Sequence, residues 1–255
     1  MNKLWNLVKD KSVIVVGPSP HLKGEKLGSF IDSFDVVVRI NEFFVESQKE
    51  DYGSKTNIAF LNLASASIDY YKAIVNKYKD KIDTIDLIVC PMRTDQVLPY
   101  NDRNLNDENI FSNYEKIGIK NNFYHIGDEY NRSITSRLSH DPTSGIITLI
   151  SLLESPAKKV FLTGYSFYLT ETNWNDETNN LLVGIGRPKI FLSGIGHPII
   201  NEVKEMKKLS NNYEKLEVDQ FIQKNILNSS IFFIKLKLLI KKIKYKVKDK
   251  IKNNE

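Results

Sequence analysis

Residues 140–167 read HDPTSGIITLISLLESPAKKVFLTGYSF and hold the clearest pair of secondary-structure elements in the chain. Thr143 stands just before the apolar run 146–153, which is how an N-capped, buried helix begins. After a proline-containing break, the short apolar run 160–164 is typical of a buried strand and ends in a glycine. A buried helix followed directly by a buried strand indicates a protein of the α/β class.

The start of this predicted helix is suited to binding an anion. The hydroxyls and free backbone N–H groups of Thr143, Ser144 and Gly145 can hold a phosphate or a carboxylate. Gly164, at the carboxyl end of the predicted strand, lets a ligand approach the backbone closely. The same residues also fit a threonine N-cap on an ordinary core helix, and the motif alone favours that simpler interpretation. Other stretches of the chain change the balance.

Five more short apolar runs are spaced along the chain as the strands of one sheet would be. Between them lie stretches of helical character, such as residues 67–78, and a polar excursion over 93–120. This alternation predicts an α/β protein with a Rossmann-like, doubly wound parallel sheet in a single domain. The five runs are residues 13–16, 35–41, 57–61, 86–90 and 122–126.

Two of these strands end in residues suited to a ligand. The first is followed by Gly17-Pro18-Ser19-Pro20, a strand-to-loop glycine that lacks the G-x-G-x-x-G pattern of dinucleotide-binding proteins. The second ends with Arg39 and Asn41. Ligands of open α/β sheets bind at the carboxyl ends of the strands, so these residues are candidates for the same site as the helix start at Thr143.

The composition excludes several classes of protein. With 41% hydrophobic and 26% charged residues, the 255-residue chain is typical of a soluble globular protein with a full core. Its single cysteine, Cys90, allows neither an internal disulfide nor a cysteine-based metal cage. The N-terminus lacks the pattern of a signal peptide, and no stretch approaches the ~18 apolar residues that cross a bilayer. We therefore expect a cytoplasmic enzyme.

The net charge of +5 is unevenly distributed. Residues 225–255 contain nine lysines against Asp249 and Glu255, which gives this tail +7 and leaves the other 224 residues at −2. A body of that charge is not expected to bind nucleic acid. We therefore divide the chain into a catalytic domain, residues 1–224, and a basic amphipathic tail, residues 225–255.

Apolar residues of the tail recur on one face of a predicted helix, and lysines occupy much of the remaining surface. This pattern is typical of a helix lying in an anionic membrane surface, where each lysine contributes ~1 kcal/mol. We expect residues 231–252 to hold the protein peripherally at the inner face of the membrane. A core-packing helix with a lysine-rich solvated face is the alternative. The predicted apolar face consists of Phe232, Leu236, Leu239, Ile240, Ile243 and Val247.

Residues 165–196 form a long, glycine-punctuated segment, and such segments in compact domains are often functional. The segment ends at His197-Pro198, where a helical pattern resumes. Because proline is favoured at the first helical position, we expect His197 to be the N-cap. The helix dipole there disfavours the imidazolium form and leaves an imidazole that can accept a proton. His197 is thus a candidate general base, although most histidines at such junctions are surface or capping residues.

Three stretches, in this order, resemble the sialylmotifs of the animal-type sialyltransferases, glycosyltransferase family 29. Residues 15–41 are similar to the large motif, and residues 142–165 are similar to the small motif. His197 and Glu202 have the spacing of the very small motif. The ordered set is more specific than any one of the three, and it identifies the chain as a divergent, bacterial-like member of that family.

The resemblance implies a sialyltransferase-type variant of the GT-A fold that uses CMP-sialic acid, needs no metal and inverts the anomeric centre. His197 matches the general base of the family. Glu202 is a possible supporting residue, which we expect to anchor a local loop because it does not share a helical face with His197. The matching donor-binding residues are Gly17, Ser19, Asn41, Thr143, Ser144, Gly145 and Gly164.

The chain departs from the family pattern at several positions. Pro18 stands where the family has an asparagine whose amide contacts the nucleotide. A histidine-rich patch of the family is best matched after Trp174, where Asn175 and Asp176 replace a histidine expected to neutralise the departing phosphate. Trp174 and Asn175 are therefore further supporting candidates. The disulfide that joins the large and small motifs of the animal enzymes is missing, which suits a cytoplasmic bacterial protein.

Three functions remain open. The first is transfer of sialic acid from CMP-sialic acid to a hydroxyl of a glycan, expected to be lipid-linked, in lipooligosaccharide, capsule or protein glycosylation. CMP-Kdo has the same activated 2-keto acid chemistry, so a transferase for Kdo or another 2-keto sugar is the second. Pro18 and Asn175 motivate the third, a catalytically degenerate partner that binds nucleotide sugars. No D-x-D pair for a metal–diphosphate is evident, so no metal cofactor is expected.

Overall fold

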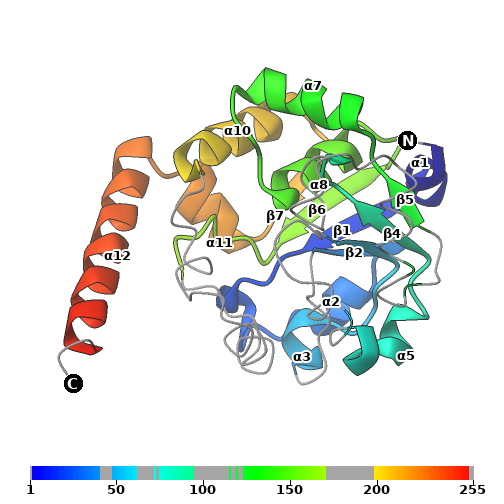
Figure 1. Ribbon diagram of the computed structural model, residues 1–255, viewed down its shortest axis with the longest axis horizontal. Helices are drawn as coiled ribbons and strands as arrows, with labels where there is room; N and C mark the ends of the chain where they lie inside the picture. The colour runs from blue at the N-terminus through cyan, green and yellow to red at the C-terminus, as the bar shows by residue number, and fades with distance from the viewer. Residues whose placement is uncertain are drawn as a thin grey trace.

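The computed structural model describes residues 2–40, 48–61, 72, 75–94, 115, 119, 123–170 and 198–252. Within this part of the chain, seven strands form one sheet in the order β5-β4-β3-β2-β1-β6-β7, and every neighbouring pair is parallel. Figure 1 shows the sheet between layers of helices. The strands are β1 (Ser12–Val16), β2 (Val36–Ile40), β3 (Ile58–Phe60), β4 (Leu87–Cys90), β5 (Phe123–His125), β6 (Lys159–Thr163) and β7 (Leu216–Val218).

The sequence of β1 explains why both faces of the sheet are covered. Its last four residues are all apolar, and successive side chains of a strand point to opposite faces. Val13 and Val15 belong to one hydrophobic cluster, whereas Ile14 and Val16 belong to a second. A strand that is apolar at consecutive positions is thus buried on both sides, as expected in a parallel sheet.

Helices supply the two layers that bury these faces (Figure 1). The larger cluster includes side chains of α1 (Asn2–Val8), α7 (Asp128–Leu138), α8 (Ser144–Leu153) and α10 (Ile199–Asn212). The opposite layer contains the short helices η1 (Pro20–Leu22), α2 (Gly28–Asp32), α3 (Lys49–Tyr52) and α5 (Lys79–Ile82). The predicted fold class, an α/β Rossmann-like sheet covered on both faces, is confirmed.

The order of the strands reverses at β1. The strands from β1 to β5 follow one another outward, and β6 then pairs with the other side of β1. Val16 is in register with Arg39 of β2 and with Thr163 of β6, so the carboxyl ends of β1 and β6 lie together. In open α/β sheets, ligands bind in the crevice at such a switch in strand order. The fold therefore directs attention to the residues that follow Val16 and Thr163.

The predicted strands agree with the structure within one residue at each end. Thr143 is the N-cap of α8, and its hydroxyl accepts the Ile146 N–H at 3.5 Å. Residues 67–78 and 93–120, for which a helix and a polar excursion were expected, lie for the most part outside the described residues. The sequence patterns did not predict α7 or β7.

The prediction for the start of α10 is wrong by one residue. Pro198, not His197, is the N-cap, because its ψ of 57° is not helical and the helix begins at Ile199. The Pro198 carbonyl accepts the N–H groups of Asn201 and Glu202, so the first turn closes on the proline itself. His197 lies outside the described residues.

The C-terminal helices follow β7 in close succession. α11 (Gln220–Ile222) runs into the π-helical turn η4 (Gln223–Leu227), and α12 (Ile231–Lys252) stands beside the body in Figure 1. Ile226 and Ile234 are fully buried in the larger cluster, so packing on the body continues past the boundary placed after residue 224. No helix among the described residues has both the length and the apolar character needed to cross a membrane.

Candidate active site at the carboxyl ends of β1 and β6

The glycines that follow β1 and β6 press their backbones together. A Cβ atom added to Gly17 would lie 2.5 Å from the Gly164 carbonyl oxygen, and one added to Gly164 would lie 2.4 Å from the Gly17 carbonyl oxygen. Gly164 also has a φ of 72°, in the left-handed region that favours glycine. The Ser19 N–H then donates to the Gly164 carbonyl at 2.9 Å, which fixes the loop after β1 against the loop after β6.

The ring of Tyr165 fills the space beside two of the candidate donor-binding glycines. Its carbons would lie 2.6 Å from a Cβ added to Gly17 and 2.7 Å from one added to Gly145. Internal packing therefore accounts for a glycine at both positions, and direct contact of these glycines with a donor stays a prediction. Burial raises the pKa of the Tyr165 phenol well above its usual value. Among the described residues, its buried hydroxyl has no hydrogen-bond partner.

Glu202 ties the start of α10 to the start of α8. The Thr143 N–H donates to one carboxylate oxygen at 2.6 Å, and the Thr143 hydroxyl donates to the other at 3.1 Å. The side chain is only 3% exposed, and burial raises the pKa of Glu202 to about 7 although the two bonds from Thr143 oppose the shift. These are the contacts of a residue that anchors a loop.

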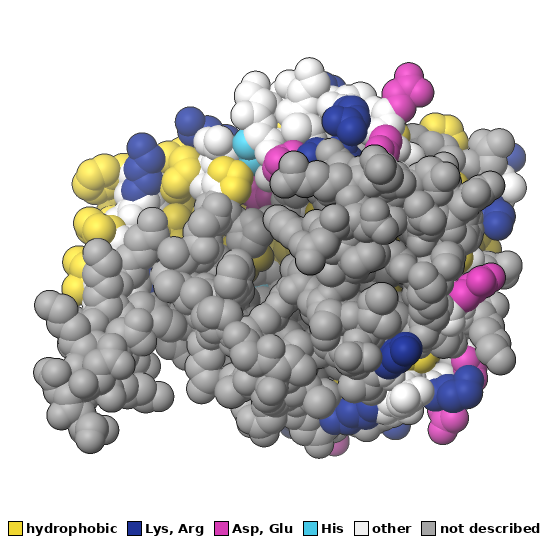
Figure 2. Space-filling view, in the orientation of Figure 1, with side chains coloured by type: hydrophobic (Ala, Val, Ile, Leu, Met, Phe, Trp, Pro, Cys, Tyr) yellow, Lys and Arg dark blue, Asp and Glu magenta, His cyan; other side chains and the backbone are white. Residues whose placement is uncertain are grey.

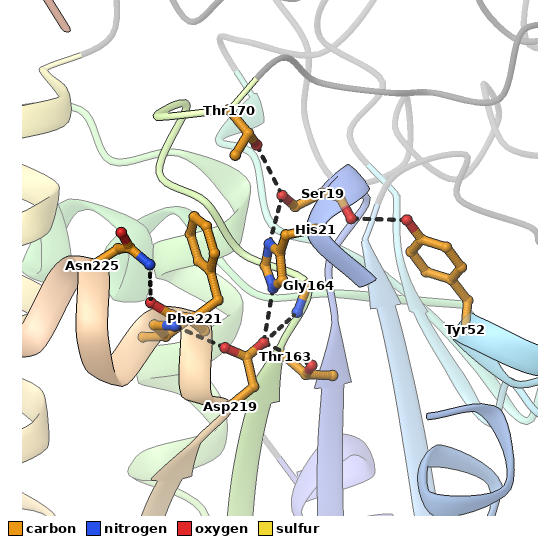
Figure 3. A network of polar contacts seen from close by, with 10 residues as sticks. Ser19, His21, Tyr52, Thr163, Gly164, Thr170, Asp219, Phe221 and Asn225 are labelled. Atoms are coloured by element: carbon orange, nitrogen blue, oxygen red, sulfur yellow. Dashed lines mark hydrogen bonds and ion pairs between the residues drawn. The ribbon is translucent and has the colours of Figure 1, made fainter. Parts of the chain in front are cut away.

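A second buried carboxylate, Asp219, organises the loop after β1 (Figure 3). Its Oδ2 atom accepts the Thr163 hydroxyl at 2.9 Å and the Gly164 N–H at 3.1 Å, and it lies 3.0 Å from Nε2 of His21. Nδ1 of His21 lies in turn 2.9 Å from the hydroxyl of Ser19. Ser19, His21 and Asp219 thus form a hydrogen-bonded chain at the switch point.

The surroundings of this chain hold each member in place. The ring of Phe221 stacks on His21 with the ring centroids 4.1 Å apart and the planes 8° from parallel. The Ser19 carbonyl accepts a hydrogen bond from the Tyr52 hydroxyl at 2.9 Å, and the Ser19 hydroxyl lies 3.1 Å from Oγ1 of Thr170. The side chains of His21 and Asp219 are only 9% and 8% exposed, so their polar atoms interact in an environment from which water is largely excluded.

Asp219 is held in its ionised form by the groups that donate to it. Burial raises the pKa of its carboxyl, but bonds from His21, the Ile222 N–H and the Thr163 hydroxyl outweigh burial and hold the pKa below its usual value. The Ile222 N–H donates to Oδ1 at 2.8 Å, so Asp219 is also the N-cap of α11. A fixed negative charge therefore stands directly behind the imidazole of His21.

Other predicted site residues have different surroundings. The Ser144 hydroxyl lies 3.9 Å from Sδ of Met92, and the side chain is 7% exposed. Arg39 is buried within β2 and donates to the carbonyls of Tyr52 and Lys55. These bonds hold the segment around Tyr52 and Lys55 against β2. The remaining candidates lie outside the described residues: Asn41, Trp174, Asn175 and His197.

His21 and Asp219 are the two residues of the site that sequence reasoning missed. His21 lacks the spacing of a metal-ligand set, so its position in the sequence indicates no role in a site. A signal for Asp219 exists in the sequence, because an aspartate between the short run Leu216–Val218 and a following helix is a typical N-cap. Nothing in the sequence pairs it with His21, which is 198 positions away.

A family comparison bears on this geometry. The sequence model described as glycosyltransferase family 29 (sialyltransferase) matches residues 7–168, from α1 through the loop after β6. The chain belongs to this sialyltransferase family. It is therefore a glycosyltransferase, and the matched part of the family 29 chain includes Ser19, Thr143 and Gly164. No curated protein sequence matches it at a significant level.

Solved structures that are similar to this family 29 chain include two sialyltransferases. A tyrosine-to-phenylalanine variant of the sialyltransferase CST-II in complex with CMP is 19% identical, with a TM-score of 0.56, over 86% of this chain and 88% of that chain. A mammalian sialyltransferase in complex with Gal-beta-1-3GalNAc-ortho-nitrophenol is 22% identical, with a TM-score of 0.42, over 69% of this chain and 67% of that chain. The similarity to CST-II supports the fold.

Proposed function

We propose that this glycosyltransferase moves sialic acid from CMP-sialic acid to a glycan hydroxyl with inversion at the anomeric carbon. The observation that carries the proposal is the junction of the large-motif and small-motif stretches at the switch point. The Ser19 N–H bonds to the Gly164 carbonyl there, and Gly145 packs on Tyr165, the residue after Gly164. A nucleotide at this edge of the sheet would meet residues of both motifs.

The start of α8 supports an anionic group of the donor near this junction. The first backbone N–H groups of a helix have no partner within the helix and favour negative charge. The Tyr165 hydroxyl, buried and without a partner among the described residues, lies beside Gly145 and is a further potential donor. A phosphate or a sugar carboxylate satisfies donors of this kind, and donors fixed in advance stabilise the charge that develops on the leaving phosphate.

His197 is our proposed general base. It precedes Pro198, the N-cap of α10, and the first turn of α10 carries Glu202, which binds Thr143 at the start of α8. The acceptor hydroxyl must lose its proton as its oxygen attacks the anomeric carbon, and a positioned imidazole contributes about 10²–10⁴-fold to such a step. His197→Ala should therefore keep CMP binding and lose turnover by that factor.

The test of the function is a donor screen on the full chain. CMP release is measured with CMP-sialic acid and with CMP-Kdo, each with and without a lipooligosaccharide acceptor. Acceptor-dependent release from CMP-sialic acid is the expected result. Release from CMP-Kdo alone identifies the Kdo transferase, and binding of both donors without turnover identifies a degenerate partner. Turnover is expected to persist in EDTA, because we propose that the transfer needs no metal.

We also propose that α12 holds the enzyme at an anionic membrane surface, where a lipid-linked acceptor is found. The side of the helix that faces the body includes Ile234 and Leu238, whereas Phe232, Leu236, Leu239 and Ile243 are exposed. At 3.6 residues per turn, the exposed apolar residues lie roughly opposite Ile234. Figure 2 shows hydrophobic and basic side chains together along this edge of the molecule.

The charges on α12 fit the same role. Lys235 and Lys244, both exposed, lie on either flank of the apolar stripe at helical spacing. The Lys241 ammonium instead donates to the carbonyls of Tyr168 and Thr170 at 2.7 Å each, which fixes α12 to the loop after β6. A stripe of exposed apolar side chains between lysines is typical of a helix lying in the interface of an anionic bilayer.

Vesicle binding of the full chain tests this second proposal. Phe232 and Leu239 are 71% and 54% exposed, so replacing both by serine should leave the fold intact. Two apolar side chains withdrawn from the bilayer cost about 3 kcal/mol, so partitioning onto vesicles of phosphatidylcholine and phosphatidylglycerol should fall about a hundredfold. Phe30→Ser, at a 43% exposed position of α2, is the matched control and should bind like wild type. Equal binding by all three proteins contradicts the proposal.

A further inference from the structure

The imidazole of His21 lies in the candidate site, and the transfer chemistry proposed above assigns no role to it. It lies between the Ser19 hydroxyl and the Asp219 carboxylate, with the Phe221 ring stacked on its face (Figure 3). Its side chain is 9% exposed. A buried, orientated imidazole that touches a hydroxyl on one side and a carboxylate on the other can hold a proton for the hydroxyl.

The contacts of Asp219 decide which ring nitrogen of His21 carries a hydrogen. An ionised carboxylate has only acceptor atoms, and Oδ2 already accepts from the Thr163 hydroxyl and the Gly164 N–H. Nε2 of His21, 3.0 Å from the same oxygen, must therefore be the donor. This leaves Nδ1 either bare, in the neutral ring, or protonated, in the imidazolium.

The state of Nδ1 decides what the Ser19 hydroxyl can offer to a ligand. When Nδ1 is bare, it accepts the only hydrogen of the Ser19 hydroxyl, across 2.9 Å. The Ser19 oxygen is then an acceptor toward Thr170, 3.1 Å away, and it has no hydrogen for an anion. When Nδ1 is protonated, it donates to the Ser19 oxygen, and the hydrogen of the hydroxyl is free to point at a phosphate.

We propose that His21 is a positioning residue that takes up a proton when the phosphate of the CMP donor binds at Ser19. The proton comes from solvent and forms an N–H bond at Nδ1; no bond between heavy atoms of the protein is made or broken. The imidazolium then donates to Ser19, and Ser19 donates to the phosphate oxygen. This inference rests on the proposed function, because it needs a CMP-sugar at the switch point.

The charges around His21 suit such an uptake. Asp219, from the loop after β7, places a carboxylate oxygen 3.0 Å from Nε2, so a proton that arrives at Nδ1 enters a ring that already faces an anion. From α12, Lys241 approaches through the Thr170 carbonyl, so its charge lies near the far side of Ser19 and adds attraction for a phosphate. Phe221 of α11 and Tyr52 of α3 face His21 and Ser19 without a charge.

The proposed contact of His21 with the phosphate through Ser19 also replaces a group that this chain lacks relative to its family. Asn175 and Asp176 stand where a histidine was expected to neutralise the departing phosphate. An imidazolium at His21 supplies a positive charge to the same group through Ser19. As CMP leaves, charge grows on its phosphate, and a hydrogen bond that strengthens with this charge lowers the barrier.

Calorimetry of the full chain measures the proposed proton directly. CMP is titrated at a pH where its phosphate is fully ionised, in buffers of different ionisation enthalpy, and cytidine serves as the ligand without a phosphate. CMP binding should take up a proton, and cytidine binding should take up none. Because CMP has no sugar carboxylate, uptake with CMP assigns the effect to the phosphate. His21→Gln should abolish the uptake and lower turnover by roughly ten- to a hundredfold.

NMR of the imidazole nitrogens of wild-type protein provides a second readout that needs no variant. Nδ1 of His21 should change from an unprotonated to a protonated signal when CMP is added, with Nε2 protonated throughout. His125→Gln is the matched control, because His125 is a buried histidine in β5, at the far edge of the sheet. Its Nε2 contacts the Met92 carbonyl. Its proton uptake should equal that of wild type.

The outcomes separate this inference from the proposed function. CMP binding without proton uptake, with Nδ1 of His21 unprotonated in the complex, overturns the role of His21 and leaves the transferase intact. Uptake that persists in His21→Gln also overturns it, since the proton then binds elsewhere. Failure of CMP to bind at all overturns both proposals.

Discussion

Asp219 and Glu202 are both carboxylates buried beside the carboxyl ends of β1 and β6, yet the pKa of one is lowered and the pKa of the other is raised. Asp219 accepts from two backbone N–H groups, a hydroxyl and an imidazole. Among the described residues, Glu202 accepts from the N–H and the hydroxyl of Thr143 alone. Burial disfavours charge at both places, and the number of donors decides the outcome.

The difference assigns the two carboxylates different tasks. Asp219 is a fixed anion that joins β6, α11 and the loop after β1, and it orients His21. Glu202 joins the starts of α8 and α10, with a pKa of about 7, so its charge varies in the neutral range. The site thus contains one permanent charge behind the proposed phosphate contact and one titrating anchor at the helix start.

The largest effect is expected when the permanent charge is removed. Asp219→Asn places an amide NH₂ against groups that are themselves donors, and each buried donor left without an acceptor costs about 1–3 kcal/mol. Urea unfolding should show this loss. Glu217→Gln is the control, since the Lys159–Glu217 pair is exposed and such pairs contribute at most about 1 kcal/mol. Similar losses of unfolding free energy in both variants would mean that Asp219 stabilises the fold no more than an exposed ion pair does.

A smaller, pH-dependent effect is expected at Glu202. Its pKa is about 7 in the folded protein against 4.5 in the unfolded chain, so the folded state holds the proton more tightly. Wild type therefore loses stability from this group as the pH rises from about 4.5 to 7. A glutamine at this position does not titrate, so the Glu202→Gln variant lacks this loss. The free energy of unfolding of the variant minus that of wild type should therefore increase by about 2–3 kcal/mol between pH 5 and 7.5. Parallel stability curves contradict the assignment.

The packing at the start of α8 provides the next test. Gly145→Ala puts a Cβ 2.7 Å from the Tyr165 ring, and overpacking of this kind costs about 2 kcal/mol in thermal or urea unfolding. If the ring is the cause, the cost should be smaller in a Tyr165→Ala background, because the space is then open. Additive losses in the double variant would show that the glycine is needed for another reason.

The sequence predicts the sheet well because its central strands are apolar at consecutive positions. Val13–Val16 and 36–38 are of this kind, and the glycines and hydroxyls after the strands mark the ligand edge. The apolar face of α12 was also predicted from the sequence. Its residues from Phe232 to Ile243 are exposed, and Ile234, on the other side of the helix, packs on the body.

The remaining features depend on contacts between distant parts of the chain. β7 is only three residues long, which is too short for a periodic pattern, and Asp219 follows it. The pairing of Asp219 with His21 becomes visible only when β7 joins the sheet beside β6. The family resemblance implied that Gly17 and Gly145 bind the donor, but a sequence cannot tell whether a ligand or, as here, the Tyr165 ring packs against a glycine.

The smallest change tests the central claim, which is that the carboxyl ends of β1 and β6 bind the phosphate of a CMP donor through Ser19. Ser19→Ala removes one hydroxyl from a buried position, and Ser33→Ala, in an exposed turn after α2, is the control. Calorimetry should show CMP affinity about tenfold weaker for Ser19→Ala, the loss of one hydrogen bond to a charged group, with cytidine affinity unchanged. Equal CMP affinity in wild type and Ser19→Ala would contradict the claim.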